Sequence, residues 1–111
     1  MLGLSRTNKY GNIRTEVDGI KFASKAEAHR YQELKLLQKA GEIKSFRMQP
    51  KYALYSQNNK LIGYYIADFE VIDKNDHIWA EDVKGVTTQL FNWKAKHFRR
   101  DYSLELRIIK A

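Results

Sequence analysis

The chain has 111 residues, a length that allows one domain with a single modest core. Hydrophobic residues make up 43% of it and aromatic residues 13%, which is typical of a folded protein and excludes a disordered tail. The formal net charge of +7 favours a polyanionic partner, although a basic solvated surface would explain the same charge.

Two absences from the sequence narrow the function classes further. The chain has no cysteine, so disulfides, cysteine nucleophiles and thiolate zinc sites are excluded. No apolar run approaches the ~18 residues that a membrane span needs, and the first residues lack the apolar core of a signal peptide. We therefore expect a soluble cytoplasmic protein that has no contact with membranes.

Turn and capping signals divide the chain into strands and helices. Asp18-Gly19 indicates the turn of a hairpin, the Ser24–Glu27 segment is a capping box at a helix start, and Gly41 marks the end of that helix. The predicted elements in chain order are a flexible basic arm (1–12), a hairpin (13–22), a helix (24–40), three strands (51–55, 61–72 and 77–84), a helix (87–101) and a strand (104–109). The order ββαβββαβ predicts an α/β fold, with a mixed central sheet flanked by helices, in a single domain over residues 13–111.

The most informative feature is an acid on one predicted strand, followed by acid-x-lysine on the next. Asp68 lies in the first of these strands, and Asp82 and Lys84 lie in the second. Residues two apart in a strand share a face, so Asp82 and Lys84 point the same way while Glu81 points the other way. Carboxylates among apolar strand residues are costly to desolvate unless a cation joins them. We interpret the set as a candidate site for a divalent metal and a water nucleophile.

The length of the hairpin loop decides which acid meets Asp68, because directly opposed residues share a face. A three-residue loop places Asp68 opposite Asp82, whereas a four-residue loop places it opposite Glu81. Only Asp82 shares a face with Lys84, so we favour Asp82 and keep Glu81 as the alternative ligand. A surface salt bridge across the hairpin would use the same residues and contribute about 1 kcal/mol or less.

A third acid, Glu27, comes from the first predicted helix. At 100° per residue it shares a stripe with Tyr31 and Leu34, which places it at the edge of the inward face of the helix. The capping box explains the same glutamate without a metal, and for Glu27 taken alone it is the better explanation. Glu27 is therefore either a helix cap or a metal ligand.

Four motifs follow one another in a specific order, which is Ser24-x-x-Glu27, Gln49-Pro50, Ala67-Asp68-Phe69 and Asp82-Val83-Lys84-Gly85. In this order and spacing they resemble the PD-(D/E)xK nuclease superfamily over about residues 19–102. The chain looks closest to small phage-encoded members and to the Holliday-junction resolvase and transposase-endonuclease branches. It departs from the pattern at Ala67, where a proline would precede the first acid. The resemblance implies a restriction-endonuclease-like core.

The resemblance also implies an activity and roles for the site residues. The chain would be a Mg²⁺-dependent DNA endonuclease, with Mn²⁺ as a substitute metal, acting on branched or junction DNA as a homodimer. Asp68, Asp82 and the Val83 carbonyl would hold the metal, and Glu27 would complete the site directly or through a water. Lys84 would orient or help deprotonate the attacking water and offset charge on the phosphate.

Further candidate DNA contacts lie outside the acidic set. Gln49 occupies the place of a glutamine that related nucleases carry near the site, although it is equally explained as a turn residue before Pro50. The outer face of the second predicted helix combines an aromatic ring with cations, a pattern typical of backbone contact and base stacking or of a dimer interface. This face carries Trp93, Lys96 and Arg100, with Arg99 to one side. Lys94 flanks the inward stripe of the same helix, from where it could reach the active site.

Two other functions fit the same sequence. A catalytically inactive DNA-binding module on the same fold would use the positive charge without the chemistry, and a structural partner protein would use the acids only in salt bridges. The three histidines, His29, His77 and His97, show no metal-ligand spacing, so they are expected on the surface or in contact with nucleic acid.

Overall fold

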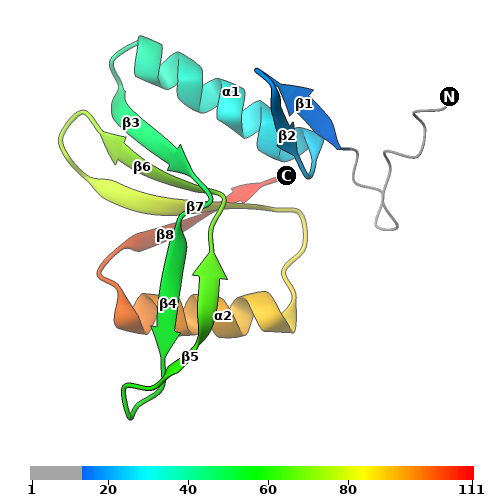
Figure 1. The fold of residues 1–111 in the computed structure, drawn as a ribbon. Coiled ribbons are helices and arrows are strands. Elements are labelled where there is room, and N and C mark those ends of the chain that lie inside the picture. The colour runs from blue at the N-terminus through cyan, green and yellow to red at the C-terminus, as the bar shows by residue number, and fades with distance from the viewer. Residues whose placement is uncertain (1–13) are drawn as a thin grey trace, which may run out of the picture.

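The computed structural model describes residues 14–111 (Figure 1). The predicted basic arm at residues 1–12 lies outside the described residues. Along the described part of the chain the elements are β1 (Thr15–Val17), β2 (Ile20–Phe22), α1 (Lys25–Lys39), β3 (Ile43–Met48), β4 (Lys51–Tyr55), β5 (Leu61–Ile66), β6 (Phe69–Asp73), β7 (Ile78–Lys84), α2 (Gln89–Asp101) and β8 (Glu105–Lys110). Neither of these helices has the length and apolar character needed to cross a bilayer.

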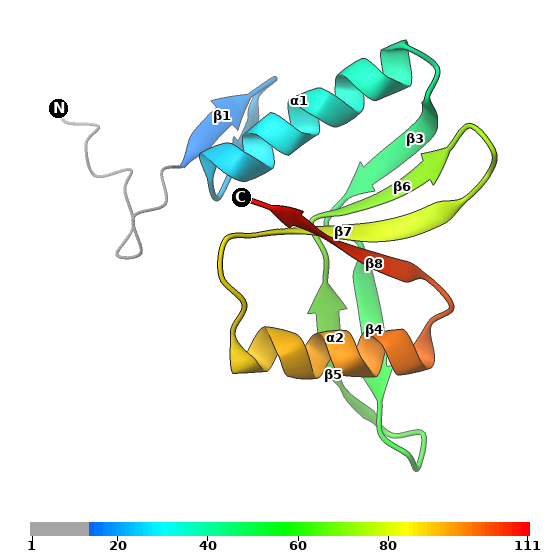
Figure 2. The ribbon, with the colours of Figure 1, turned by 180° about the vertical axis from the view of Figure 1, so that it is seen from behind.

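A mixed four-stranded sheet, in the order β3-β6-β7-β8, lies at the centre of the fold (Figure 1). β3, β6 and β7 pair antiparallel, whereas β7 and β8 are parallel and are joined by α2. Strand alternation turns Trp79 toward the buried cluster that includes α1, and Ala80 toward the cluster that includes α2. The two helices thus cover opposite faces of the sheet (Figure 2). The predicted α/β class, with a mixed central sheet flanked by helices, is confirmed.

Both predicted helices form, and local signals set their ends. The Ser24 hydroxyl accepts a hydrogen bond from the Glu27 amide at 3.2 Å, and the Thr88 hydroxyl accepts one from the Phe91 amide at 3.1 Å. Gly41 follows α1 with a φ of +80°, a left-handed conformation that favours glycine. The buried side chains of the two helices are Ala28, Tyr31 and Leu34 in α1 and Phe91, Ala95 and Phe98 in α2.

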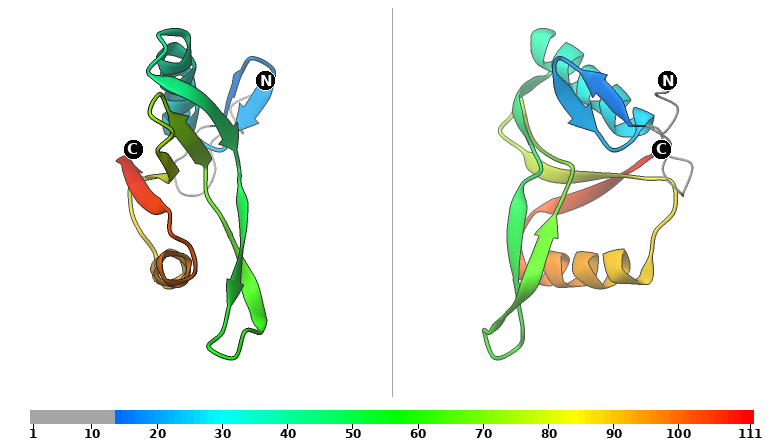
Figure 3. Two further views of the ribbon diagram at one scale, coloured as in Figure 1. Left: turned by 90° about the vertical axis from the view of Figure 1, so that its left-hand side faces the viewer. Right: turned by 45° about the vertical axis from the view of Figure 1, so that its right-hand side comes forward.

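The single long strand predicted over residues 61–72 is wrong. β5 ends at Ile66 and β6 begins at Phe69, and the two strands belong to different sheets. β5 pairs with β4 in a two-stranded ribbon that extends away from the body of the fold beside α2 (Figure 3), whereas β6 pairs with β3 and β7. The chain therefore leaves one sheet and enters the other at Ala67-Asp68. This break places Asp68 at the junction of the two sheets.

The sequence-based prediction also missed β3. A register shift between Ile43 and Ser45 interrupts the alternation of apolar and polar residues that identifies a strand. The observed element order is consequently ββαβββββαβ along the described residues. After β3 the chain turns at Gln49, whose φ of +52° is left-handed, and Pro50 leads into β4. The predicted break at Gln49-Pro50 is confirmed.

Candidate active site

The register of the β6–β7 hairpin favours Asp82 over Glu81 as the partner of Asp68. Ile72 pairs with Ile78, so an odd number of residues separates the two strands, and the loop is the three-residue one, at 74–76. The last registered pair on the other side is Phe69 with Glu81. Extending the register by one residue places Asp68 across from Asp82, as the three-residue loop predicts.

Glu81 points to the face covered by α1 and is fully buried there, with 0% of its surface exposed. The Arg30 guanidinium donates to both carboxylate oxygens, from Nε at 2.8 Å and from Nη2 at 2.7 Å. The Trp79 indole N–H donates to the same carboxylate at 2.8 Å. The structure thus uses Glu81 as the buried counter-ion of Arg30, on the face opposite Lys84.

Asp82 points to the other face, toward α2, and is only 3% exposed. The Tyr65 hydroxyl donates to Asp82 Oδ2, and Lys84 Nζ lies 3.2 Å from Oδ1. Burial raises the pKa of the Asp82 carboxyl to about 6, although the Tyr65 hydrogen bond and the charge of Lys84 act in the opposite direction. Lys84 Nζ also lies 4.8 Å from the ring centre of Phe91, at the start of α2. The expectation that Asp82 and Lys84 share a face is confirmed.

Asp68 lies between the other two acids. Its Oδ2 accepts a hydrogen bond from the Val83 backbone amide at 2.6 Å, and the Glu27 and Asp82 carboxyls both act on its pKa. Burial, together with the neighbouring Glu27 carboxyl, raises the pKa of Asp68 to about 7, and the Val83 amide acts in the opposite direction. Asp68, at the break between β5 and β6, thus brings together carboxyl groups from α1 and β7.

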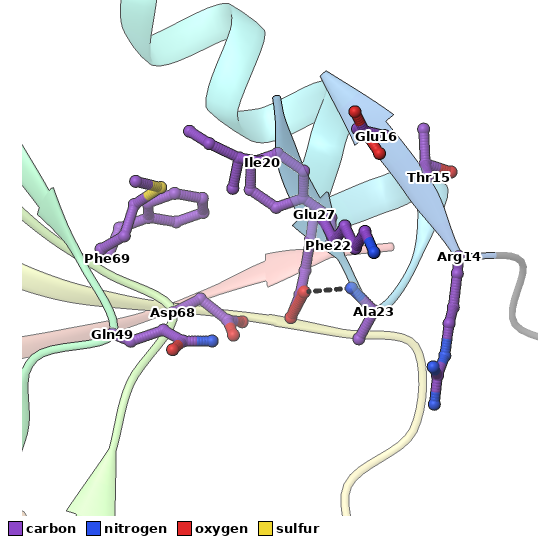
Figure 4. Close-up of a pocket in the computed structure, with 12 residues that line it drawn as sticks. Arg14, Thr15, Glu16, Ile20, Phe22, Ala23, Glu27, Gln49, Asp68 and Phe69 are labelled. Atoms are coloured by element: carbon purple, nitrogen blue, oxygen red, sulfur yellow. Dashed lines mark hydrogen bonds between the residues drawn. The ribbon is translucent and has the colours of Figure 1, made fainter. Parts of the chain in front are cut away.

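Glu27 caps α1 and faces Asp68 at the same time. Its Oε2 accepts a hydrogen bond from the Ala23 amide at 3.3 Å, one residue before the N-cap (Figure 4). The predicted cap is therefore confirmed. Figure 4 also shows the Glu27 and Asp68 carboxyls directed toward one another, so the cap position brings this acid to the site.

Glu27 and Asp68 open onto a cavity of about 690 Å³ between the β1–β2 hairpin and the end of β3. Gln49 lies beside Asp68 at the same end of the cavity (Figure 4), and its backbone N–H donates to the Asp68 backbone carbonyl at 2.9 Å. Asp82 and Lys84 are not part of the cavity lining. Glu27 and Asp68 therefore form one edge of a hollow whose other walls come from the hairpin, the end of β3 and the start of β6.

The donor set fits a hard divalent cation. Asp68, Asp82 and Glu27 present oxygen ligands only, and Lys84 is the cation that the structure pairs with this set. Burial raises the pKa values of Asp68 and Asp82, and the neighbouring carboxyls, Glu27 beside Asp68 and Asp68 beside Asp82, raise them further. Within residues 14–111 no three acids or histidines are already positioned to hold a metal. Because both Asp82 oxygens have partners, a bound cation would compete with Lys84 for Oδ1.

The α2 residues expected to contact DNA lie apart from this cavity. Trp93 is 43% exposed and packs on the His97 ring at a centroid distance of 4.4 Å. Arg100 donates to the Tyr55 carbonyl and to the Asp101 carboxylate, which holds the helix end against β4. None of the cavity residues comes from α2. The remaining cations of the helix are the exposed Lys96 and Arg99 and the half-buried Lys94.

Sequence reasoning missed three contributions to the site. Tyr65 holds Asp82, Arg30 holds Glu81, and the β1–β2 hairpin closes the cavity. The general rule that a buried tyrosine hydroxyl seeks a partner could have identified Tyr65 as a neighbour of a strand acid. Arg30 and the hairpin carried no comparable signal, because their contacts join segments far apart in the sequence.

A sequence model of the family described as "Protein of unknown function (DUF1064)" matches residues 7–111. The match covers almost the whole chain and includes the acids and the lysine described above. No curated protein and no solved structure matches the chain. The family description gives no activity, ligand or partner.

Proposed function

This chain belongs to the family described as Protein of unknown function (DUF1064), and we propose that it is a Mg²⁺-dependent DNA endonuclease that hydrolyses phosphodiester bonds. The observation that carries the proposal is the position of Asp68, which faces Glu27 and lies across from Asp82 in the strand register. Lys84 Nζ lies 3.2 Å from Asp82 Oδ1. Carboxylates gathered beside a lysine are what metal-assisted phosphodiester hydrolysis requires. We further propose that the sheet between α1 and α2 is a restriction-endonuclease-like core of the PD-(D/E)xK type.

In this proposal Asp68 and Asp82 would hold the metal, and the Val83 carbonyl and Glu27 would complete its oxygen ligands. Mg²⁺ held there, or Mn²⁺ in its place, would supply a Lewis acid for the phosphodiester and would lower the pKa of a water nucleophile. Lys84 orients that water and offsets phosphate charge. The chain's own hydrogen bonds place these groups, since Tyr65 fixes Asp82 and the Val83 amide fixes Asp68.

The proposed substrate is branched or junction DNA. The net charge of +7 supports a polyanionic partner, and exposed cations on α2 provide a surface for phosphate contact apart from the cavity. Trp93 among these cations suits base stacking, or contact with a second copy of the chain in a homodimer. The preference for branched DNA and the dimer rest on the resemblance to resolvases.

The test is cleavage of supercoiled plasmid and of a four-way junction, with Mg²⁺ or with EDTA. We expect cleavage by wild type only with Mg²⁺, and its loss in Asp82→Asn and Lys84→Ala. Asp76→Asn and Lys60→Ala change an exposed acid and an exposed lysine away from the site and should cleave like wild type. Wild type that never cleaves, or cleavage that survives both site substitutions, would refute the proposal. Binding of the junction without any cleavage would instead support an inactive DNA-binding module.

A further inference from the structure

We propose that the cavity between the β1–β2 hairpin and the sheet binds one unpaired nucleotide of the DNA strand, next to the acids of the candidate active site. The inference deepens the proposed nuclease function and rests on it. It assigns a role to the hairpin, which the sequence predicted only as a structural element. It also specifies the substrate class, because a strand that fills this cavity must be single-stranded at that nucleotide.

The cavity has the size of a site for a small ligand. A volume of about 690 Å³ lies in the range of sites that enclose a small ligand, which is ~300–1,000 Å³. A duplex is read on an open surface or with a protein element in its groove, and it does not enter a hollow of this size. A nucleotide can enter when its base is unpaired or is turned out of the stack.

The walls of the cavity are apolar on one side and acidic on the other. Ile20, Phe22, Met48 and Phe69 line part of the cavity, and Ile20 and Phe69 lie apart from the carboxyls in Figure 4. Met48, at 40% exposure, is the most accessible of the four. An apolar wall with a flexible methionine suits the flat apolar face of a base of any identity. The opposite edge, with Asp68, meets the sugar–phosphate part of the strand.

Two cations on the hairpin supply the third argument. Arg14 and Lys21 line the cavity and are exposed, and neither forms an ion pair with any other described residue. Lys21 lies opposite Glu16 in the hairpin register, yet no ion pair joins the two side chains. Cations without a carboxylate partner beside an acidic site are placed to bind the phosphates that flank the nucleotide.

The cavity is separate from the basic surface of α2. Helix α2 covers one face of the sheet, whereas α1 and the β1–β2 hairpin lie on the other side (Figure 2). A branched substrate can therefore contact α2 through phosphates while its unpaired nucleotide occupies the cavity. Substitutions in the cavity should therefore change the preference for unpaired over paired strands, whereas substitutions on α2 should change only the overall affinity for DNA.

The experiment measures binding in EDTA, where no Mg²⁺-dependent cleavage takes place. The probes are a fluorescein-labelled ten-nucleotide thymidine oligomer and a labelled ten-base-pair duplex, titrated with the full chain by fluorescence anisotropy. Stacking of a base contributes on the order of 1–3 kcal/mol, so we expect the single strand to bind roughly tenfold more tightly than the duplex. Arg14→Ala, Lys21→Ala and Met48→Ala should each reduce this preference by about threefold or more, since each removes one contact. Lys60→Ala, an exposed lysine outside the cavity, should leave the preference unchanged.

Equal affinity of wild type for the two probes would overturn the inference, as would cavity variants that behave like Lys60→Ala. All the substituted side chains are exposed, so unfolding is not expected, and circular dichroism verifies the fold of each variant. The results distinguish a failure of the cavity proposal from a failure of the nuclease proposal. A protein that prefers the single strand but never cleaves DNA refutes the nuclease and supports the cavity, whereas a nuclease without the preference refutes the cavity alone.

Discussion

Replacing Arg30 with methionine should destabilise the fold strongly, because Glu81 would lose its charged partner inside the protein. Glu81 is fully buried and accepts two hydrogen bonds from Arg30 and one from Trp79. Removing one partner of a buried ion pair costs about 3–5 kcal/mol, since the remaining charge is left uncompensated. The Trp79 hydrogen bond persists and Arg30 is partly exposed, so we expect the lower end, about 3 kcal/mol.

The assay is urea denaturation followed by tryptophan fluorescence, which yields the free energy of unfolding by linear extrapolation. Adding Glu81→Gln to Arg30→Met should recover roughly half of the loss, because the buried charge is removed while an acceptor for Trp79 remains. Lys44→Met is the matched control, since it breaks an exposed ion pair with Asp76 and should cost about 1 kcal/mol or less. If Arg30→Met were no more destabilising than Lys44→Met, the stabilising role of the buried Arg30–Glu81 ion pair would be refuted. Glu81→Gln should also retain Mg²⁺ binding.

Three further predictions concern Asp82, Asp68 and the cap of α2. Tyr65→Phe removes the hydroxyl that fixes Asp82 and should weaken Mg²⁺ binding about tenfold by calorimetry, whereas Tyr64→Phe, at an exposed tyrosine, should not. In EDTA, the free energy of unfolding should fall as the pH rises from 5 to 8. The reason is that the folded-state pKa of Asp68, about 7, lies above its unfolded value, so its contribution is lost as the pH rises through 7. Asp68→Asn should reduce this pH dependence, and an unchanged slope would contradict the raised pKa. Thr88→Ala removes the cap of α2 and should cost about 1 kcal/mol in thermal or urea unfolding without changing Mg²⁺ affinity.

Local sequence signals predicted the parts of the fold that short-range interactions determine. Asp18-Gly19 turned the first hairpin, Ser24 capped α1, and strand alternation separated Glu81 from Asp82. These features depend on backbone conformation within a few residues. They therefore appear in the sequence without knowledge of the partners across the fold.

The features of the fold that the sequence did not predict depend on pairing between segments far apart in the chain. An apolar run from Leu61 to Ile72 looks like one strand, but β4 pairs with its first half and β3 and β7 with its second, so the chain breaks at Asp68. The bulge in β3 obscured its alternation. The contacts Arg30–Glu81 and Tyr65–Asp82 join residues 51 and 17 positions apart, for which a single sequence contains no direct signal.

The proposed function requires the carboxyls around Asp68 to hold a divalent metal for phosphodiester hydrolysis. The most direct measurement is the rate of four-way-junction cleavage as a function of Mg²⁺ concentration, for wild type, Asp68→Asn and the exposed-acid control Asp76→Asn. We predict a saturable dependence on Mg²⁺ in wild type and in Asp76→Asn, and no cleavage at any Mg²⁺ concentration in Asp68→Asn. Cleavage by Asp68→Asn with the Mg²⁺ dependence of wild type would contradict the proposed role of Asp68 as a metal ligand.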